Sequence, residues 1–220
     1  MNYWKKIKKN DTPSTSGILD EFVDKLNSQS KVFEVGCGYG RIIDKCISKK
    51  SFIYGIDINK NEIDALKLKY ADYENVSLEV NDITDRNFKL KVDYKFDYVF
   101  LNGLLGALKL EQRMVALKNV LKIIHSNSII HLSEFLIFEK NKAMKDRYLK
   151  DFPETGEYGT FFVCSTEGEK IYQTHNFSQD EIKTLVLKDF KIIKKELLDF
   201  KSYTGKIKPG IILLLQIKNK

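Results

Sequence analysis

The chain has 220 residues, of which 43% are hydrophobic and 30% are charged, and its formal net charge at pH 7 is +7. This length fits one domain, residues 1–220, with a sizeable core, and the composition is that of a soluble globular protein. The longest apolar run, residues 211–215, is far too short to cross a bilayer. No apolar signal core follows the N-terminus. We therefore expect a cytoplasmic protein without membrane insertion.

The basic residues and the cysteines argue against two classes of site. Only four of the 37 basic residues are arginines, and the lysines are scattered along the chain. Nucleic-acid surfaces usually combine arginines with aromatic residues, so a nucleic-acid substrate is unlikely. The three cysteines, Cys37, Cys46 and Cys164, have no metal-ligand spacing. We expect free thiols, and the spacing predicts no metal site.

One stretch organises the chain. A short apolar segment, residues 32–35, contains one acid and runs into alternating glycines, with Glu34, Gly36, Gly38 and Gly40 in the pattern E-x-G-x-G-x-G. Residues 41–47 follow with helical spacing. A strand, a glycine turn and a helix in this order open a nucleotide-binding α/β unit. The glycines allow bare backbone to approach a ligand.

The residues that follow distinguish between two kinds of nucleotide site. The next strand, residues 52–57, ends in Asp57, an acid able to accept hydrogen bonds from both ribose hydroxyls. A dinucleotide site usually has its third glycine at the position that Arg41 occupies here, and its strand is normally apolar where this chain has Glu34. The combined pattern resembles the class I S-adenosylmethionine-dependent methyltransferases.

This resemblance implies a fold and a cofactor. The fold is α/β, a three-layer Rossmann-like sheet of seven mostly parallel strands with a C-terminal antiparallel hairpin. The cofactor is S-adenosyl-L-methionine, with S-adenosyl-L-homocysteine as product. The cofactor-binding residues that it implies are Glu34, Gly36, Cys37, Gly38, Gly40, Asp57, Ile58, Asp82, Ile83, Asn102 and Gly103.

The elements expected around this loop follow one another in order. A helix start at residues 13–16 and an apolar face formed by Ile18, Leu19, Phe22, Val23 and Leu26 predict a cap helix within residues 1–30. A capped helix over residues 60–70 precedes a strand at 76–80. By the resemblance, Asp82 accepts from the adenine amino group and Ile83 offers a backbone donor and an apolar wall.

The next three elements lead to the substrate side. Residues 96–103 are expected to form a strand and its exit, 110–124 a helix and 128–136 a strand. By the resemblance, Asn102 and Gly103 lie beside the reactive methyl group. Many relatives have a histidine shortly after this strand, and this chain does not, which weakens the case for a general base there. We predict Glu134, His175 and Asn102 as the catalytic residues, with His131 interpreted as a hydrogen-bonded core residue.

Residues 139–176 lack a clear α/β repeat and are rich in aromatic residues. Loops at the carboxyl ends of parallel strands hold substrates, so this segment is predicted to be an insertion or substrate lid. The alternative is a hairpin that only extends the core. A capping box at 178–181 then starts a helix, and two strands near 191–200 and 210–217 finish the domain, with a turn at Pro209 and Gly210.

The sequence therefore predicts a methyltransferase that moves a methyl group to an oxygen or nitrogen of a small polar metabolite or glycan precursor, as a monomer or a homodimer. The alternatives are an RNA or protein methyltransferase, a non-catalytic module that keeps the cofactor fold, and a nicotinamide oxidoreductase. Arg41 and Glu34 disfavour the oxidoreductase. The sequence identifies neither the acceptor nor its reacting atom.

Overall fold

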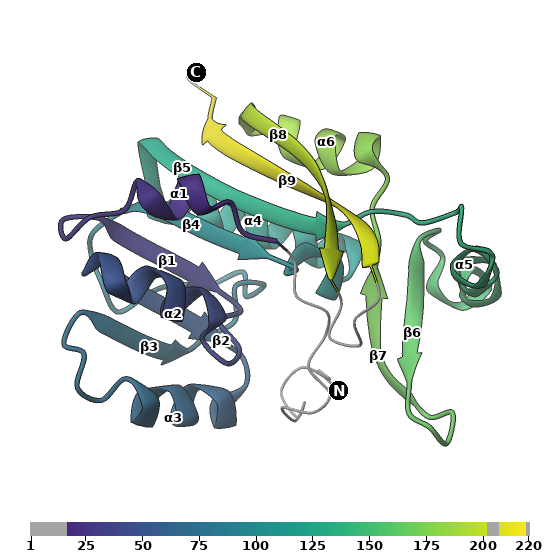
Figure 1. Ribbon diagram of the computed structural model, residues 1–220, viewed down its shortest axis with the longest axis horizontal. Coiled ribbons are helices and arrows are strands. Elements are labelled where there is room, and N and C mark those ends of the chain that lie inside the picture. The colour runs from purple at the N-terminus through teal and green to yellow at the C-terminus, as the bar shows by residue number, and fades with distance from the viewer. Residues whose placement is uncertain (1–16, 202–206, 219–220) are drawn as a thin grey trace.

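The computed structural model describes residues 17–201 and 207–218, and a seven-stranded sheet is its main element (Figure 1). Its strands are β1 Lys31–Val35, β2 Phe52–Asp57, β3 Val76–Val80, β4 Phe96–Asn102, β5 Ile124–Phe135, β8 Phe190–Lys201 and β9 Ile207–Ile217. Their order across the sheet is β3-β2-β1-β4-β5-β9-β8. Strands β1 to β5 are parallel, whereas β9 runs antiparallel to β5 and to β8. This confirms the predicted sheet.

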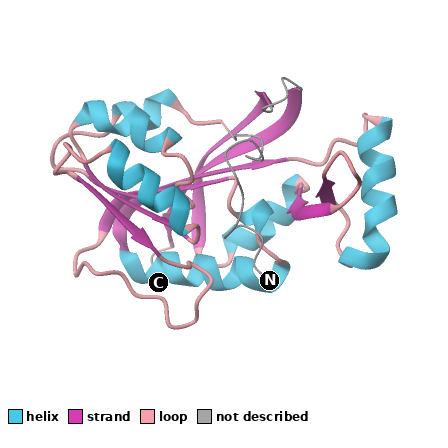
Figure 2. Cartoon of the chain, turned by 90° about the horizontal axis from the view of Figure 1, so that it is seen from below, coloured by secondary structure: helices cyan, strands magenta, loops and turns pink. Residues whose placement is uncertain are grey.

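Helices cover both faces of the sheet and give the predicted three layers (Figure 2). One face carries α1 Asp20–Asp24, α2 Arg41–Cys46 and α3 Lys60–Lys69, and the other carries α4 Leu110–Ile123 and α6 Gln179–Leu187. Two short 3-10 turns complete this part, η3 Ile47–Lys49 and η4 Leu105–Ala107. Successive strand residues point to opposite faces. Accordingly, Val32 packs with α1 and α2, while Phe33 belongs to the cluster under α4 and α6.

The first described helix is shorter than the sequence predicts. It begins at Asp20 after an N-cap at Leu19 that makes no side-chain cap, and the predicted start at residues 13–16 lies outside the described residues. Its apolar face is confirmed, because Phe22 and Val23 are buried. The Phe22 ring meets the rings of neighbouring strand residues edge-on, with centroids 5.4 Å from Tyr98 and 5.0 Å from Phe100.

The insertion contains a helix that the sequence does not reveal. Helix α5 spans Lys142–Thr155, with its N-cap side chain, Asn141, accepting from the amide of Met144. The sequence indicates no helix here because α5 buries only Tyr148 among its fourteen residues, so it presents no broad apolar stripe. A separate hairpin follows, β6 Thr160–Cys164 and β7 Lys170–His175. Figures 1 and 2 show α5 and this hairpin projecting beyond the end of the sheet to which the parallel strands point.

The C-terminal strands contain a second correction. Pro209 and Gly210 do not form a turn, because both lie inside β9, where Gly210 pairs with Leu198 and Phe135. A Cβ atom on Gly210 would lie 2.2 Å from the Phe200 ring. The glycine is therefore needed so that this buried ring can lie directly on the strand. Residues 202–206, which join β8 and β9, lie outside the described residues.

Two helix starts confirm the predicted capping. The Asn59 side chain accepts from the amide of Asn61 at the start of α3. At the start of α6, Ser178 Oγ accepts from the amide of Glu181, and Glu181 Oε2 accepts from the amide of Ser178. No helix in the described ranges combines the length and the apolar composition that a membrane crossing requires.

Candidate active site

The glycine loop is hydrogen-bonded to β2, and there is free space beside its Gly38 peptide. The amides of Gly36 and Cys37 donate to the carbonyl of Ile56, at 2.8 and 3.0 Å. Gly38 and Gly40 both adopt left-handed conformations, with φ of +48° and +78°, which favour glycine. A Cβ atom on Gly40 would lie 2.6 Å from the Tyr70 hydroxyl, whereas at Gly38 the nearest atom would be 3.6 Å away. Gly40 is thus needed for packing on α3, while Gly38 can face a ligand.

Asp57, the acid that the sequence predicts at the end of β2, lies beside the Gly38 peptide. Its Oδ2 accepts from the amide of Gly38 at 3.0 Å, and its Oδ1 accepts from the amide of Asn59 at 2.9 Å. Burial raises the pKa of this carboxyl, and the amides of Asn59, Gly38 and Ile58 oppose that rise. Each carboxylate oxygen can accept more than one hydrogen bond. Asp57 therefore keeps acceptor capacity for the two hydroxyls of a ribose.

Glu34 is a buried acid with an unsatisfied oxygen. It is 3% exposed, and its Oε2 has no hydrogen-bond partner. Burial raises its pKa well above the ordinary value, with the charge of Arg41 as the main opposing influence. An orphaned buried oxygen costs free energy unless a ligand or water satisfies it. An ammonium group of a ligand would satisfy this atom, and the cofactor-binding role of Glu34 stays a prediction.

Glu62 is a functional candidate that the sequence analysis does not name. It lies in the first turn of α3, and it is the residue whose Oε2 faces Gly38. Burial raises its pKa to about 7, the charge of Asp57 adds to the rise, and hydrogen bonds from Tyr39 and Asn59 oppose it. The available signal was its spacing, because residue 62 shares a helix face with Leu66 and Tyr70, both buried. An acid on such a face is uncommon.

The residues predicted at the adenine end have local partners. Asp82 Oδ1 accepts from the amide of Thr84 at 2.8 Å and from its hydroxyl at 2.7 Å, which is the bonding of a turn residue. The Ile83 side chain lies in the main core cluster, and its carbonyl accepts from Asn119. Ile58 is half-buried. The cofactor contacts of these three residues stay predictions.

Asn102 and His131 fasten the start of the described chain to the sheet. The Asn102 amide nitrogen donates to the carbonyl of Gly17 at 3.1 Å, and its oxygen lies 3.0 Å from His131 Nδ1. His131 Nε2 accepts from the amide of Leu19 at 3.1 Å, so Nδ1 carries the proton. Burial lowers the pKa of His131 to about 4. The interpretation of His131 as a hydrogen-bonded core residue is confirmed, while a catalytic role for Asn102 stays a prediction.

Glu134 lies at the predicted edge but points under the η4 turn. Its Oε1 accepts from the amide of Leu105 at 2.6 Å. Burial raises its pKa to about 8, against the amides of Leu105 and Gly106 and the charge of Arg113. A Cβ atom on Gly106 would lie 3.0 Å from Glu134 and 2.7 Å from the carbonyl of His175. The η4 turn therefore lies between Glu134 and His175 and is close to both.

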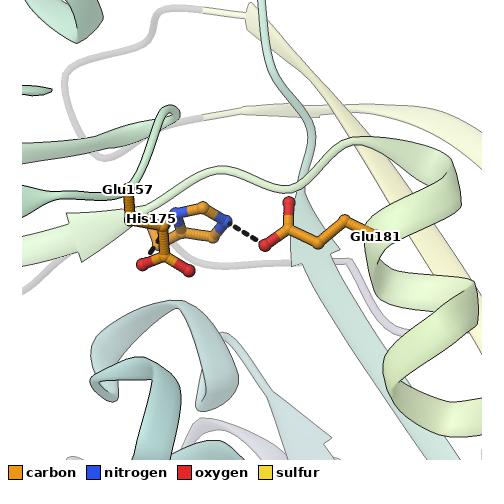
Figure 3. A group of neighbouring side chains, drawn as sticks. All are labelled: Glu157, His175 and Glu181. Atoms are coloured by element: carbon orange, nitrogen blue, oxygen red, sulfur yellow. Dashed lines mark ion pairs between the residues drawn. The ribbon is translucent and has the colours of Figure 1, made fainter.

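His175 is buried, and both its ring nitrogens lie against groups of the protein (Figure 3). The Thr160 hydroxyl donates to Glu157 Oε2 at 2.8 Å and lies 2.7 Å from His175 Nδ1. Since the hydroxyl has a single hydrogen, Nδ1 must be the donor to Thr160. On the other side, Glu181 Oε1 lies 2.9 Å from Nε2 without the angle of a hydrogen bond. This carboxylate therefore lies against the second ring nitrogen as an ion-pair partner.

Arg113 supplies the cation of this cluster. Its guanidinium is fully buried and forms a two-pronged ion pair with Glu157. It also lies 3.8 Å from Glu181 Oε1, and its Nε donates to the carbonyl of Leu105 at 3.0 Å. The cluster thus ties the insertion to α4, α6 and η4.

The fold therefore assembles three possible metal ligands that the sequence spacing did not indicate. Atoms of Glu157, His175 and Glu181 lie within 4.8 Å of one another. Glu157 Oε2 lies 3.4 Å from Nδ1 of the ring and Glu181 Oε1 lies 2.9 Å from Nε2. Arg113 supplies one positive charge to the two acids. The arrangement ties the insertion to α4 and α6.

The comparisons with known proteins concern the family and the fold. A family model described as a methyltransferase domain matches residues 26–189, which is more than half of the chain. Among curated proteins, no sequence matches this chain.

Solved structures share the fold. A S-adenosylmethionine-dependent methyltransferase from Methanosarcina mazei has a TM-score of 0.84 and 23% identity, over 92% of this chain and 99% of that protein. The 1,6-didemethyltoxoflavin-N1-methyltransferase of Burkholderia thailandensis, solved with S-adenosylhomocysteine, has a TM-score of 0.63 and 12% identity, over 91% and 75%. The N-methyltransferase NodS of Bradyrhizobium japonicum WM9, also with S-adenosylhomocysteine, has a TM-score of 0.58 and 12% identity, over 86% and 79%.

Proposed function

This chain belongs to the methyltransferase-domain family and is an S-adenosylmethionine-dependent methyltransferase, and from that premise we propose that its acceptor is an oxygen or a nitrogen of a small polar metabolite or glycan precursor. The observation that carries the proposal is the meeting of the glycine loop, Asp57 and the exit of β4 at one end of the sheet, with the insertion beside them. Ligands of open α/β sheets bind at that end.

The residues present fit the cofactor. Asp57 has acceptor capacity beside Gly38 for the ribose hydroxyls, and the orphaned oxygen of Glu34 suits an ammonium. The cofactor, when bound, supplies a methyl group on a sulfonium. The part of the protein is to hold donor and acceptor in line, which is worth up to about 7–11 kcal/mol in favourable intramolecular cases.

The state of the two predicted bases favours nitrogen over oxygen as the acceptor atom. A hydroxyl acceptor must lose a proton, whereas an amine needs only to be neutral. The nitrogens of His175 lie against Thr160 and Glu181. Glu134 has a pKa of about 8 and is held by Leu105, so it is mostly protonated at pH 7. Positioning of a neutral amine requires neither group.

Two further observations support a small acceptor. Of the four arginines, Arg113 is buried, Arg147 lies over the Phe161 ring at 4.4 Å and Arg41 is half-buried, which leaves Arg86 as the exposed one. An arginine-rich face for RNA is thus lacking in the described residues. The two similar enzymes from Burkholderia and Bradyrhizobium are N-methyltransferases by name. The cytoplasmic location and the monomeric or dimeric state stay predictions.

The test is transfer of a labelled methyl group from S-adenosylmethionine to a fractionated cell extract. We expect label in the small-molecule fraction, and most of it in compounds that carry a free amine. Asp57→Ala serves as the cofactor-deficient control. Label confined to RNA or protein would overturn the proposal, and cofactor binding with no transfer to any fraction would favour the non-catalytic module.

A further inference from the structure

Two carboxyl groups converge on one peptide of the glycine loop. Asp57 reaches Gly38 from the end of β2, with Oδ2 at 3.0 Å from the amide. Glu62 reaches it from α3, with Oε2 at 3.6 Å from the position of a Cβ atom on Gly38. Both acids belong to elements that frame the side of the loop where a ligand can approach.

Glu62 is not explained by the start of its helix. At α6, the glutamate three residues after the N-cap returns its carboxylate to the N-cap amide. The carboxyl of Glu62 instead receives side-chain hydrogen bonds from Tyr39 and Asn59. It is 5% exposed, while Asp64 on the same helix is half-exposed and pairs with Lys60. Burying an acid beside another acid costs free energy unless something favours both.

We propose that Glu62 binds the cofactor together with Asp57, as a second hydrogen-bond acceptor beside Gly38, and that cofactor binding displaces a proton from Glu62 to solvent. The proposal rests on the cofactor placement proposed above. It adds a carboxyl to the ligand shell that neither the glycine pattern nor the strand-end acid indicates.

The direction of the proton transfer follows from the surroundings. The groups that face Glu62 are Asp57 from β2 together with Tyr39 and Cys37 from the loop, and its pKa of about 7 leaves it half protonated at neutral pH. Hydroxyl donors and a positive sulfonium both favour the ionised carboxylate. The bound cofactor therefore lowers the proton affinity of Glu62, and the released proton passes to the buffer.

The experiment is calorimetric titration of the full chain with S-adenosylhomocysteine. At pH 7, in two buffers of different ionisation enthalpy, we expect release of about half a proton. The affinity should rise about tenfold between pH 6 and pH 8, because only the ionised form binds well. Glu62→Gln keeps the shape of the side chain and removes its titration, so its affinity should vary less over this pH range than that of the wild type. Asp64→Asn, on the same helix, should match the wild type.

Each other outcome has a separate meaning. No proton release by the wild type, or the same pH dependence in Glu62→Gln, overturns the proposal. A uniform loss of affinity in Glu62→Gln that keeps the wild-type pH dependence also overturns the proton linkage. Should Glu62→Gln fail to fold, the absence of proton release by the wild type still overturns the proposal. Failure of the wild type to bind S-adenosylhomocysteine at all would instead refute the cofactor placement.

Discussion

The two ends of the candidate site hold their carboxyl groups in opposite ways. Beside the glycine loop, burial raises the pKa values of Glu34, Asp57 and Glu62. Beside the insertion, burial also acts to raise the pKa of Glu157, but hydrogen bonds from Arg113 and Thr160 and the charges of Arg113 and His175 outweigh it and lower the pKa. The difference is the supply of counter-charge.

We therefore expect the acids beside the glycine loop to bind a ligand and the acids beside the insertion to stabilise the fold. The loop side buries three carboxyls near one half-buried arginine, Arg41, which suits a positively charged cofactor. The insertion side pairs its acids with the guanidinium of Arg113 and with His175. Substitutions on the loop side should therefore change cofactor affinity, and substitutions on the insertion side should change stability.

The largest effect is expected from Arg113→Met. Removal of the buried cation leaves Glu157 and Glu181 without their main counter-charge. Breaking a buried pair on one side typically costs about 3–5 kcal/mol, so the free energy of unfolding in urea at pH 7 should fall by that amount. The double variant Arg113→Met with Glu157→Gln should recover part of the loss, because it removes one unpaired charge.

Arg86→Met is the matched control for this substitution. Arg86 is exposed, and surface substitutions usually change stability by no more than about 0.5 kcal/mol. A loss of less than about 1 kcal/mol in Arg113→Met would mean that the cluster does not hold the insertion, and the contrast between the two ends would then fail.

On the loop side, Asp57→Ala should weaken cofactor binding without unfolding the chain. Hydrogen bonds to a charged group contribute about 1.5–3 kcal/mol, and a strand-end acid that is partly exposed contributes little to the core. Calorimetry with S-adenosylhomocysteine measures the loss, with Asp64→Ala as control. Unchanged affinity in a folded Asp57→Ala variant would remove Asp57 from the ribose role.

The sequence predicts the loop side well because its signals are local. The pattern from Glu34 to Gly40 and the acid at the end of β2 are fixed by strand and turn geometry within a few residues. The α6 capping box is a signal of the same kind, whereas the fold class is what the family resemblance implies. Glu62 is indicated neither by the glycine pattern nor by the strand-end acid, and its one signal is its spacing on a buried helix face.

The insertion side is harder to predict because its contacts join distant segments. Arg113 and Glu157 are 44 positions apart, and no periodicity links them. His175 was predicted as a base from its position alone, and only the fold reveals the carboxylates on either side of its ring. Gly210 resembled a turn residue, but it is a strand residue under the Phe200 ring, which only tertiary packing shows.

Glu134 lies between the two ends of the site, so the pH dependence of its contribution to stability tests the difference in counter-charge between them. Its pKa is raised from 4.5 to about 8, so the folded state holds a proton that the unfolded state releases. Its contribution to stability is therefore fully present below pH 4.5 and is lost as the pH rises toward 8, at about 1.4 kcal/mol for each pH unit at most. Glu134→Gln keeps an oxygen acceptor for the amide of Leu105 and does not titrate.

Glu157→Gln is the comparison variant in this test, because the pKa shift of Glu157 is opposite in direction to that of Glu134. The folded pKa of Glu157 is lowered, so its contribution is present above 4.5 and is lost as the pH falls. Urea unfolding at pH 4, 5, 6, 7 and 8 gives the stability difference between wild type and each variant. Relative to its variant, the wild type should lose stability with rising pH for Glu134 and with falling pH for Glu157. Parallel curves for the two pairs would show that counter-charge does not distinguish the two ends of the site.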